Sequence, residues 1–161
     1  MQTLILPGYS KTNKDWVDEI VNNLKIDGVI RPFYWMHWGD DSMHFDAQEK
    51  ADLIVKHIKD DNINIIAKSI GTLIATKIVA VIPNQIKKVI LCGIPKVDLN
   101  EADFEFIKTV CLNNKNKITI IQNISDPHGT FEDVKDLGKI VPKESSDHNY
   151  PYFEDFNRIL S

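Results

Sequence analysis

Short apolar runs alternate with segments of helical periodicity along the whole chain. Strands are predicted at 3–6, 29–34, 63–67, 89–92, 118–121 and, more weakly, 138–141. Helices are predicted at about 14–25, 46–60, 72–81 and 152–160, and the stretch 93–116 has room for one more. The strand runs are continuously apolar rather than alternating, which is typical of parallel strands that are buried on both faces.

This order of elements predicts one α/β domain that spans residues 1–161. Strands separated by helices form βαβ units with right-handed crossovers. We therefore expect a doubly wound, mostly parallel six-stranded sheet flanked by helices, and we find no repeat or linker that divides the chain. Ligands of such sheets bind at the carboxyl ends of the strands, near a topological switch point. The loops that follow the strands are consequently the candidates for chemistry.

The strongest local signal lies between the third strand and the helix that follows it, in Ala67-Lys68-Ser69-Ile70-Gly71. Small residues two positions before and after a serine permit a sharp turn that exposes the serine hydroxyl above the sheet. A second interpretation is that Ser69 is an ordinary helix N-cap. Lys68 is expected to be exposed at the surface.

This segment resembles the nucleophile elbow of the α/β-hydrolase superfamily, G-x-S-x-G, with Ala67 in place of the first glycine. The resemblance implies that Ser69 is a nucleophile, followed in the chain by an acid and then a histidine. Asp126 follows the fifth strand and His148 precedes the last helix, as in that family. The resemblance covers nearly the whole chain. It implies a small serine hydrolase or esterase without a lid domain, a Ser-His-Asp triad and the strand order 2-1-3-4-5-6.

The loop after the first strand, Pro7-Gly8-Tyr9-Ser10, resembles the oxyanion loop of the same superfamily, with Pro7 where that family carries a histidine. The resemblance implies that the backbone N–H groups of Tyr9 and Ile70 form the oxyanion hole. A simple Pro-Gly turn is the alternative interpretation.

The segment from Trp35 to Phe45 is rich in aromatic residues, histidine and aspartate. We expect it to cover the sheet edge or to form a wall of the substrate pocket, with Trp35, Trp38 and Ser10 as substrate-binding residues. The spacing of its histidines and aspartates matches no metal-binding motif, so neither a metal nor another cofactor is expected.

Other titratable residues compete for roles in the triad. Asp98 follows the fourth strand and is an alternative acid, because some members of the superfamily place the acid there. Asp147 adjoins His148, but neighbours in an extended loop point in opposite directions, which makes it a poor partner. His128 is expected at the surface or at the edge of the pocket.

Composition narrows the possible partners. The net charge is −4, from 19 basic and 23 acidic residues, and no basic face stands out, which disfavours nucleic acid as a partner. No apolar run approaches the roughly 20 residues of a membrane span, and the amino-terminal segment does not resemble a signal peptide. Cys92 and Cys111 are expected to be reduced thiols in a cytoplasmic protein.

Together these features predict a hydrolase that cleaves a carboxylic ester of a small or medium acyl group through an acyl-enzyme. A thioester substrate is a close alternative. A non-catalytic binding protein on the same fold is a further alternative, because a fold does not determine its function. The sequence leaves the acyl chain length, the leaving group and the oligomeric state open.

Overall fold

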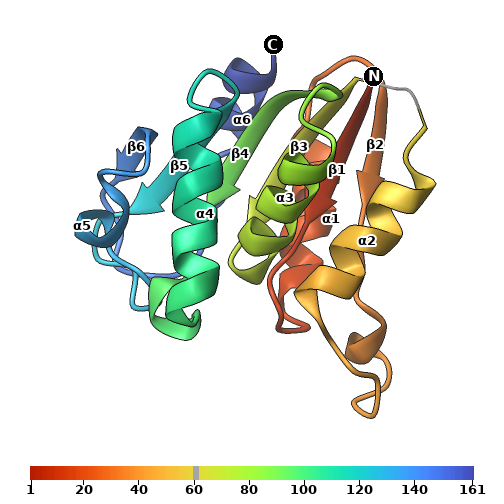
Figure 1. Ribbon diagram of the computed structural model, residues 1–161, viewed down its shortest axis with the longest axis horizontal. Helices are drawn as coiled ribbons and strands as arrows, with labels where there is room; N and C mark the ends of the chain where they lie inside the picture. Colours follow the sequence, from red (N-terminus) through yellow and green to blue (C-terminus); the bar gives the residue numbers. More distant parts are fainter. Residues whose placement is uncertain (60–61) are drawn as a thin grey trace.

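A computed structural model describes residues 1–59 and 62–161. Within these ranges six strands form one sheet in the order β2-β1-β3-β4-β5-β6, and all five neighbouring pairs are parallel (Figure 1). The predicted doubly wound sheet and its strand order are thereby confirmed. The strands are β1 (Gln2–Leu6), β2 (Val29–Pro32), β3 (Ile63–Lys68), β4 (Ile86–Cys92), β5 (Ile118–Asn123) and β6 (Lys139–Lys143).

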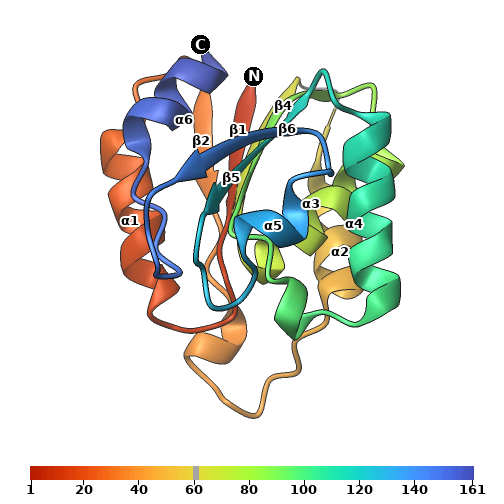
Figure 2. The same ribbon diagram turned by 90° about the vertical axis from the view of Figure 1, so that its left-hand side faces the viewer.

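Helices cover both faces of the sheet (Figure 2). One face carries α1 (Asn13–Asn23) and α6 (Phe153–Leu160), and the other carries α2 (Ala47–His57), α3 (Ile70–Val81) and α4 (Glu101–Asn113). Short 3-10 turns occupy Met36–Trp38 and Lys96–Asp98. No helix in the described ranges is long and apolar enough to cross a membrane.

Two details of the predicted elements need correction. The helix expected over 46–60 ends at His57, and Asp60 lies outside the described residues. A further helix, α5 (Phe131–Val134), was not expected, since four residues are too few to show a periodic pattern. It begins with a capping box in which Thr130 and Asp133 exchange hydrogen bonds, and this local polar signal specifies it.

The sheet separates two apolar clusters. The larger one packs between the sheet and helices α2, α3 and α4, and the smaller one lies under α1 and α6. The smaller cluster contains Trp16, Tyr150 and Phe156, all buried. Since each fully buried large apolar side chain contributes about 1.5–3 kcal/mol, these two layers hold the strand ends in fixed positions.

Both outer strands of the sheet contain a proline. Pro32 lies in β2, where it pairs with Ile5 of β1, and Pro142 lies in β6, where it pairs with Gln122 of β5. Proline has no N–H to donate, and for this reason it is confined to edge strands.

The start of α3 packs directly against the end of β1. A Cβ atom placed on Gly71 would lie 2.2 Å from the carbonyl oxygen of Leu6 and 2.8 Å from that of Pro7. These obstacles are backbone atoms, which cannot rotate away. Gly71 therefore lets the loop after β1 and the turn after β3 approach each other at the switch point of the sheet.

Gly71→Ala is expected to lower the free energy of unfolding by about 2 kcal/mol or more, because the added methyl group overlaps fixed backbone. Gly39→Ala is the matched control, since its Cβ would meet nothing closer than 3.8 Å. Urea denaturation of the two variants measures the difference. Equal stability of both variants would contradict the close approach at Gly71.

Candidate active site

Ser69 sits in a strained turn between β3 and α3. Its φ of 54° and ψ of −126° make it the one non-glycine residue with positive φ in the described ranges. Such a conformation costs about 1–3 kcal/mol and persists only where neighbouring bonds impose it. Here Ser69 N donates to the carbonyl oxygen of Cys92 at 3.0 Å, while Thr72 N and Thr72 Oγ1 donate to Ser69 O at 2.8 and 2.6 Å.

The hydroxyl of Ser69 does not cap the helix that it precedes. Ser69 occupies the N-cap position of α3, yet its side chain makes no capping hydrogen bond. The ordinary N-cap interpretation therefore fails on geometry. The turn holds the backbone and leaves the hydroxyl available for other contacts.

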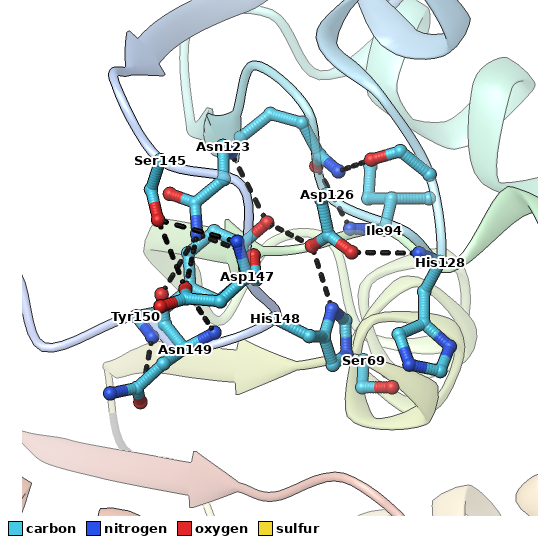
Figure 3. Close-up of polar contacts among 12 residues, drawn as sticks. Ser69, Ile94, Asn123, Asp126, His128, Ser145, Asp147, His148, Asn149 and Tyr150 are labelled. Atoms are coloured by element: carbon cyan, nitrogen blue, oxygen red, sulfur yellow. Dashed lines mark hydrogen bonds and ion pairs between the residues drawn. The ribbon is translucent and has the colours of Figure 1, made fainter.

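Asp126 and His148 come together from two loops that lie 22 residues apart in the chain. His148 Nδ1 lies 2.7 Å from Asp126 Oδ2, and the carboxylate is fully buried (Figure 3). In the same view the imidazole stands between Asp126 and Ser69. A carboxylate bonded to Nδ1 fixes the ring orientation and leaves Nε2 as the proton acceptor.

Two further donors complete the surroundings of Asp126. The backbone N–H of His128 donates to Oδ1 at 2.8 Å, and the hydroxyl of Tyr150 donates to Oδ2 at 2.5 Å. Burial opposes ionisation of the carboxyl, but the bonds from His148, Tyr150 and His128 outweigh it and hold the pKa of Asp126 below its usual value. Burial and the bond to Asp126 raise the pKa of Tyr150. The site thus contains a carboxylate and a neutral phenol.

His148 Nε2 is buried and bonds to none of the described residues. Ser69 Oγ likewise has no hydrogen-bond partner among them, and no bond joins these two atoms. A buried nitrogen without a partner is uncommon, and a catalytic role is one explanation for it. Hydrogen bonds of catalytic groups often shorten only when substrate binds.

Aromatic side chains hold the loop after β1 by its carbonyl groups. The indole of Trp35 donates to the carbonyl oxygen of Gly8 at 3.0 Å, and that of Trp38 donates to the carbonyl oxygen of Tyr9 at 2.7 Å. His37 Nε2 also lies 2.8 Å from that oxygen of Tyr9. In a trans peptide the N–H points away from the carbonyl of the same unit, so fixing Gly8 C=O directs Tyr9 N–H to the opposite side.

The N–H groups of Tyr9 and Ile70 donate to no atom of the described residues. Both residues line a cavity of about 460 Å³ together with Ser69. Ile70 is the first residue of α3, where the helix leaves its N–H groups without internal acceptors. Two free donors beside a serine hydroxyl form an arrangement that can receive a developing negative charge.

The sequence matches the family model described as alpha/beta hydrolase fold over residues 5–110. This chain belongs to the alpha/beta hydrolase family. The matched region includes Ser69, whereas Asp126 and His148 lie beyond it. A sequence search of curated proteins found no match.

Solved structures share the fold of this α/β-hydrolase at low sequence identity. Alpha/beta hydrolase domain-containing protein 10 from mouse aligns with a TM-score of 0.71 and 12% identity, over 99% of this chain and 86% of its own. Est1E from Butyrivibrio proteoclasticus, solved with ferulic acid bound, also aligns with a TM-score of 0.71 and 12% identity, over 99% of this chain and 86% of its own. A thioesterase domain from the curacin biosynthetic pathway aligns with a TM-score of 0.70 and 12% identity, over 99% and 90%.

The residues expected to bind substrate do not line the cavity beside Ser69. Trp35 and Trp38 are buried against the loop after β1, where their N–H groups bind its carbonyl oxygens. Ser10 and Trp38 line a different depression, of about 510 Å³. None of the three is among the described residues that line the cavity beside Ser69.

Two other expectations are resolved by contacts. Asp98, the alternative acid, pairs with His128 rather than His148, at 2.6 Å from Oδ2 to Nδ1. The expectation that Lys68 is exposed was wrong, because the side chain is 8% exposed and its ammonium lies 5.5 Å from the Trp16 ring centroid. Burial lowers the pKa of Lys68, although nearby negative charges oppose the shift.

Sequence reasoning missed Tyr150 altogether. Its position, two residues after His148, is a signal that could have drawn attention to it. Gly93 makes room for the ring, since a Cβ there would lie 2.4 Å from Tyr150 Cε2.

No group of three metal-ligating side chains comes together anywhere in the described chain.

Tyr150→Phe is expected to lower the free energy of unfolding by about 2 kcal/mol at pH 7, because it removes a hydrogen bond to a buried carboxylate. The pKa of Asp126 is held below 3.8 in the folded protein, so its ionisation stabilises the fold above that pH. The difference between wild type and variant should therefore shrink as the pH falls from 7 to about 3.

Urea titrations at both pH values measure this difference. Tyr152→Phe is the control, because its hydroxyl donates to Asn123 and not to Asp126. An equal loss of stability at both pH values in Tyr150→Phe would refute the bond to an ionised Asp126.

Proposed function

We propose that this α/β-hydrolase is a serine esterase that cleaves carboxylic esters of small or medium acyl groups. Ser69 is the nucleophile, His148 the base and Asp126 the residue that orients the base. The observation that carries the proposal is the buried, unpartnered Nε2 of His148, whose Nδ1 is already bound to Asp126. Membership of the family supports hydrolysis as the reaction class.

In the acylation step, Ser69 Oγ attacks the ester carbonyl carbon while its proton passes to His148 Nε2. The carbonyl oxygen gains negative charge and accepts hydrogen bonds from the N–H groups of Tyr9 and Ile70. Asp126 remains ionised and stabilises the imidazolium. The tetrahedral intermediate then collapses, and the alcohol leaves with the proton from Nε2.

In the deacylation step, water takes the place of the alcohol. His148 Nε2 accepts a proton from the water, whose oxygen attacks the acyl carbon, and the same two N–H groups receive the oxyanion. Collapse releases the carboxylic acid and returns the proton to Ser69. No cofactor takes part in this sequence of steps.

Hydrolysis of p-nitrophenyl acetate and butyrate tests the proposal. Ser69→Ala and His148→Ala are each expected to reduce turnover by a factor of about 10³ or more, because the nucleophile and its base act as a unit. Asp126→Asn is expected to reduce turnover by a factor of about 10²–10⁴, because the imidazole of His148 loses the carboxylate that orients it.

Matched variants control for general damage. His57→Ala removes an exposed histidine whose ring bonds to the carbonyl oxygen of Leu53 in its own helix and does not line the cavity beside Ser69, so this variant should retain full activity. Asp98→Asn should keep most of the activity. Loss in Asp98→Asn combined with full activity in Asp126→Asn would transfer the role of the acid to Asp98.

Thioesters are the second candidate substrate class, favoured by the likeness to a thioesterase domain of the curacin pathway. Acetyl and butyryl thioesters assayed beside the oxygen esters decide between the two classes. Labelling of Ser69 by a fluorophosphonate decides between catalysis and binding alone. Absence of labelling and of turnover in the pure protein would favour a non-catalytic binding protein.

Trp38→Phe is expected to lower kcat by about tenfold, because Tyr9 C=O loses a donor and the oxyanion loop loses part of its support. The expected change in KM is small, since the ring of Trp38 does not line the cavity beside Ser69. Steady-state kinetics with p-nitrophenyl butyrate measure both constants. A raised KM with unchanged kcat would instead indicate that Trp38 contacts the substrate.

A further inference from the structure

The cavity beside Ser69 is bordered by more negative than positive charge. Three aspartates line it, Asp46, Asp98 and Asp103, together with a single basic residue, Lys77. They come from the starts of α2 and α4 and from the loop after β4, while Lys77 lies on α3. With ionised carboxylates and an ammonium group, the formal charge of the lining is −2.

Each of the three carboxylates is fixed through one oxygen only. Asp46 Oδ1 accepts from Glu49 N at 2.8 Å, Asp103 Oδ2 accepts from Asn100 Nδ2 at 3.0 Å, and Asp98 Oδ2 pairs with His128. The second oxygen of each makes no hydrogen bond to a described residue. One oxygen of each carboxylate is thus left open as an acceptor, and a bound donor can use it without first breaking contacts within the protein.

The positive charge in the cavity does not neutralise these acids. Lys77 Nζ donates to the uncharged Gln48 Oε1 at 2.9 Å and lies 5.0 Å from the ring centroid of Phe106. It forms no ion pair with a described carboxylate, and neither do Asp46 and Asp103 with a described cation. Asp46 and Asp103 therefore keep their charge without a paired cation.

We propose that this cavity selects esters that carry an ammonium group, in the acyl or the alcohol part, over neutral and anionic esters. The inference rests on the proposed esterase function, because the position of Ser69 makes the cavity a substrate site. An ammonium group supplies a positive charge and N–H donors, and an open carboxylate oxygen of any of these aspartates can accept from it. A carboxylate in the same place meets like charge from the three aspartates.

Two series of chain-matched esters test the proposal. The acyl series consists of the p-nitrophenyl esters of 6-aminohexanoate, heptanoate and pimelate, which end in ammonium, methyl and carboxylate groups. The alcohol series compares 6-aminohexyl acetate with heptyl acetate by release of acid. Ser69→Ala provides the background rate for every compound.

In at least one series, kcat/KM for the ammonium ester should exceed that for its neutral match by about fivefold or more. In the acyl series, the pimelate ester should have the lowest kcat/KM. Each partly exposed charge accounts for about a two- to fivefold change. Asp46→Asn and Asp103→Asn should each lower the ratio of kcat/KM for the ammonium ester to kcat/KM for the neutral ester by about two- to fivefold. Lys77→Gln should raise this ratio. Asn also caps helices, so Asp46→Asn keeps the start of α2 intact.

Asp15→Asn is the control for a change of charge alone, because Asp15 is exposed on α1, on the opposite face of the sheet. It should leave the ratios unchanged. Raising the salt concentration from about 0.05 to 0.5 M should reduce the preference, as expected for partly exposed charges.

Equal kcat/KM values across both series, with Ser69-dependent hydrolysis of the neutral esters, would overturn the charge preference and leave the esterase function standing. Absence of Ser69-dependent hydrolysis of every ester would overturn both. A preference that survives Asp46→Asn and Asp103→Asn together would also refute the assignment to these carboxylates.

Discussion

The buried carboxylate of Asp126 is the constraint around which this end of the sheet is built. An ionised carboxyl without solvent needs several donors, and here it has three, from His148, Tyr150 and the backbone of His128. Each donor fixes one segment of chain. The loops after β5 and β6 are consequently held in one arrangement, and the imidazole inherits its orientation from them.

A second set of contacts places the other half of the site. The loop after β1 is short and contains Gly8, and nothing in its own sequence dictates which way its peptide groups point. Three neighbouring side chains from the segment after β2 bind its carbonyl oxygens, and the bond from Trp35 to Gly8 C=O directs the N–H of Tyr9 to the opposite side of that peptide. The aromatic segment thus supports the site indirectly, by holding the backbone of the loop after β1.

The sequence was sufficient to predict the sheet, because continuous apolar runs such as Ile63–Lys68 have few other ways to be buried. Ser69, Asp126 and His148 could be selected from their places after strands, since strand ends of a parallel sheet converge. Tyr150 and the Trp35 and Trp38 contacts could not, because they depend on side-chain direction and on which atoms meet. An aromatic residue near a pocket can line it or support it, and composition does not distinguish the two.

The prolines of β2 and β6 have a consequence for how molecules of this protein meet one another. An open sheet edge is a template for a strand from a neighbouring molecule, and pairing along it needs an unbroken row of donors and acceptors. Pro32 and Pro142 each interrupt that row on one side of the sheet. The six-stranded ladder is therefore terminated at both ends, which protects a protein with such apolar strands from polymerising edge to edge.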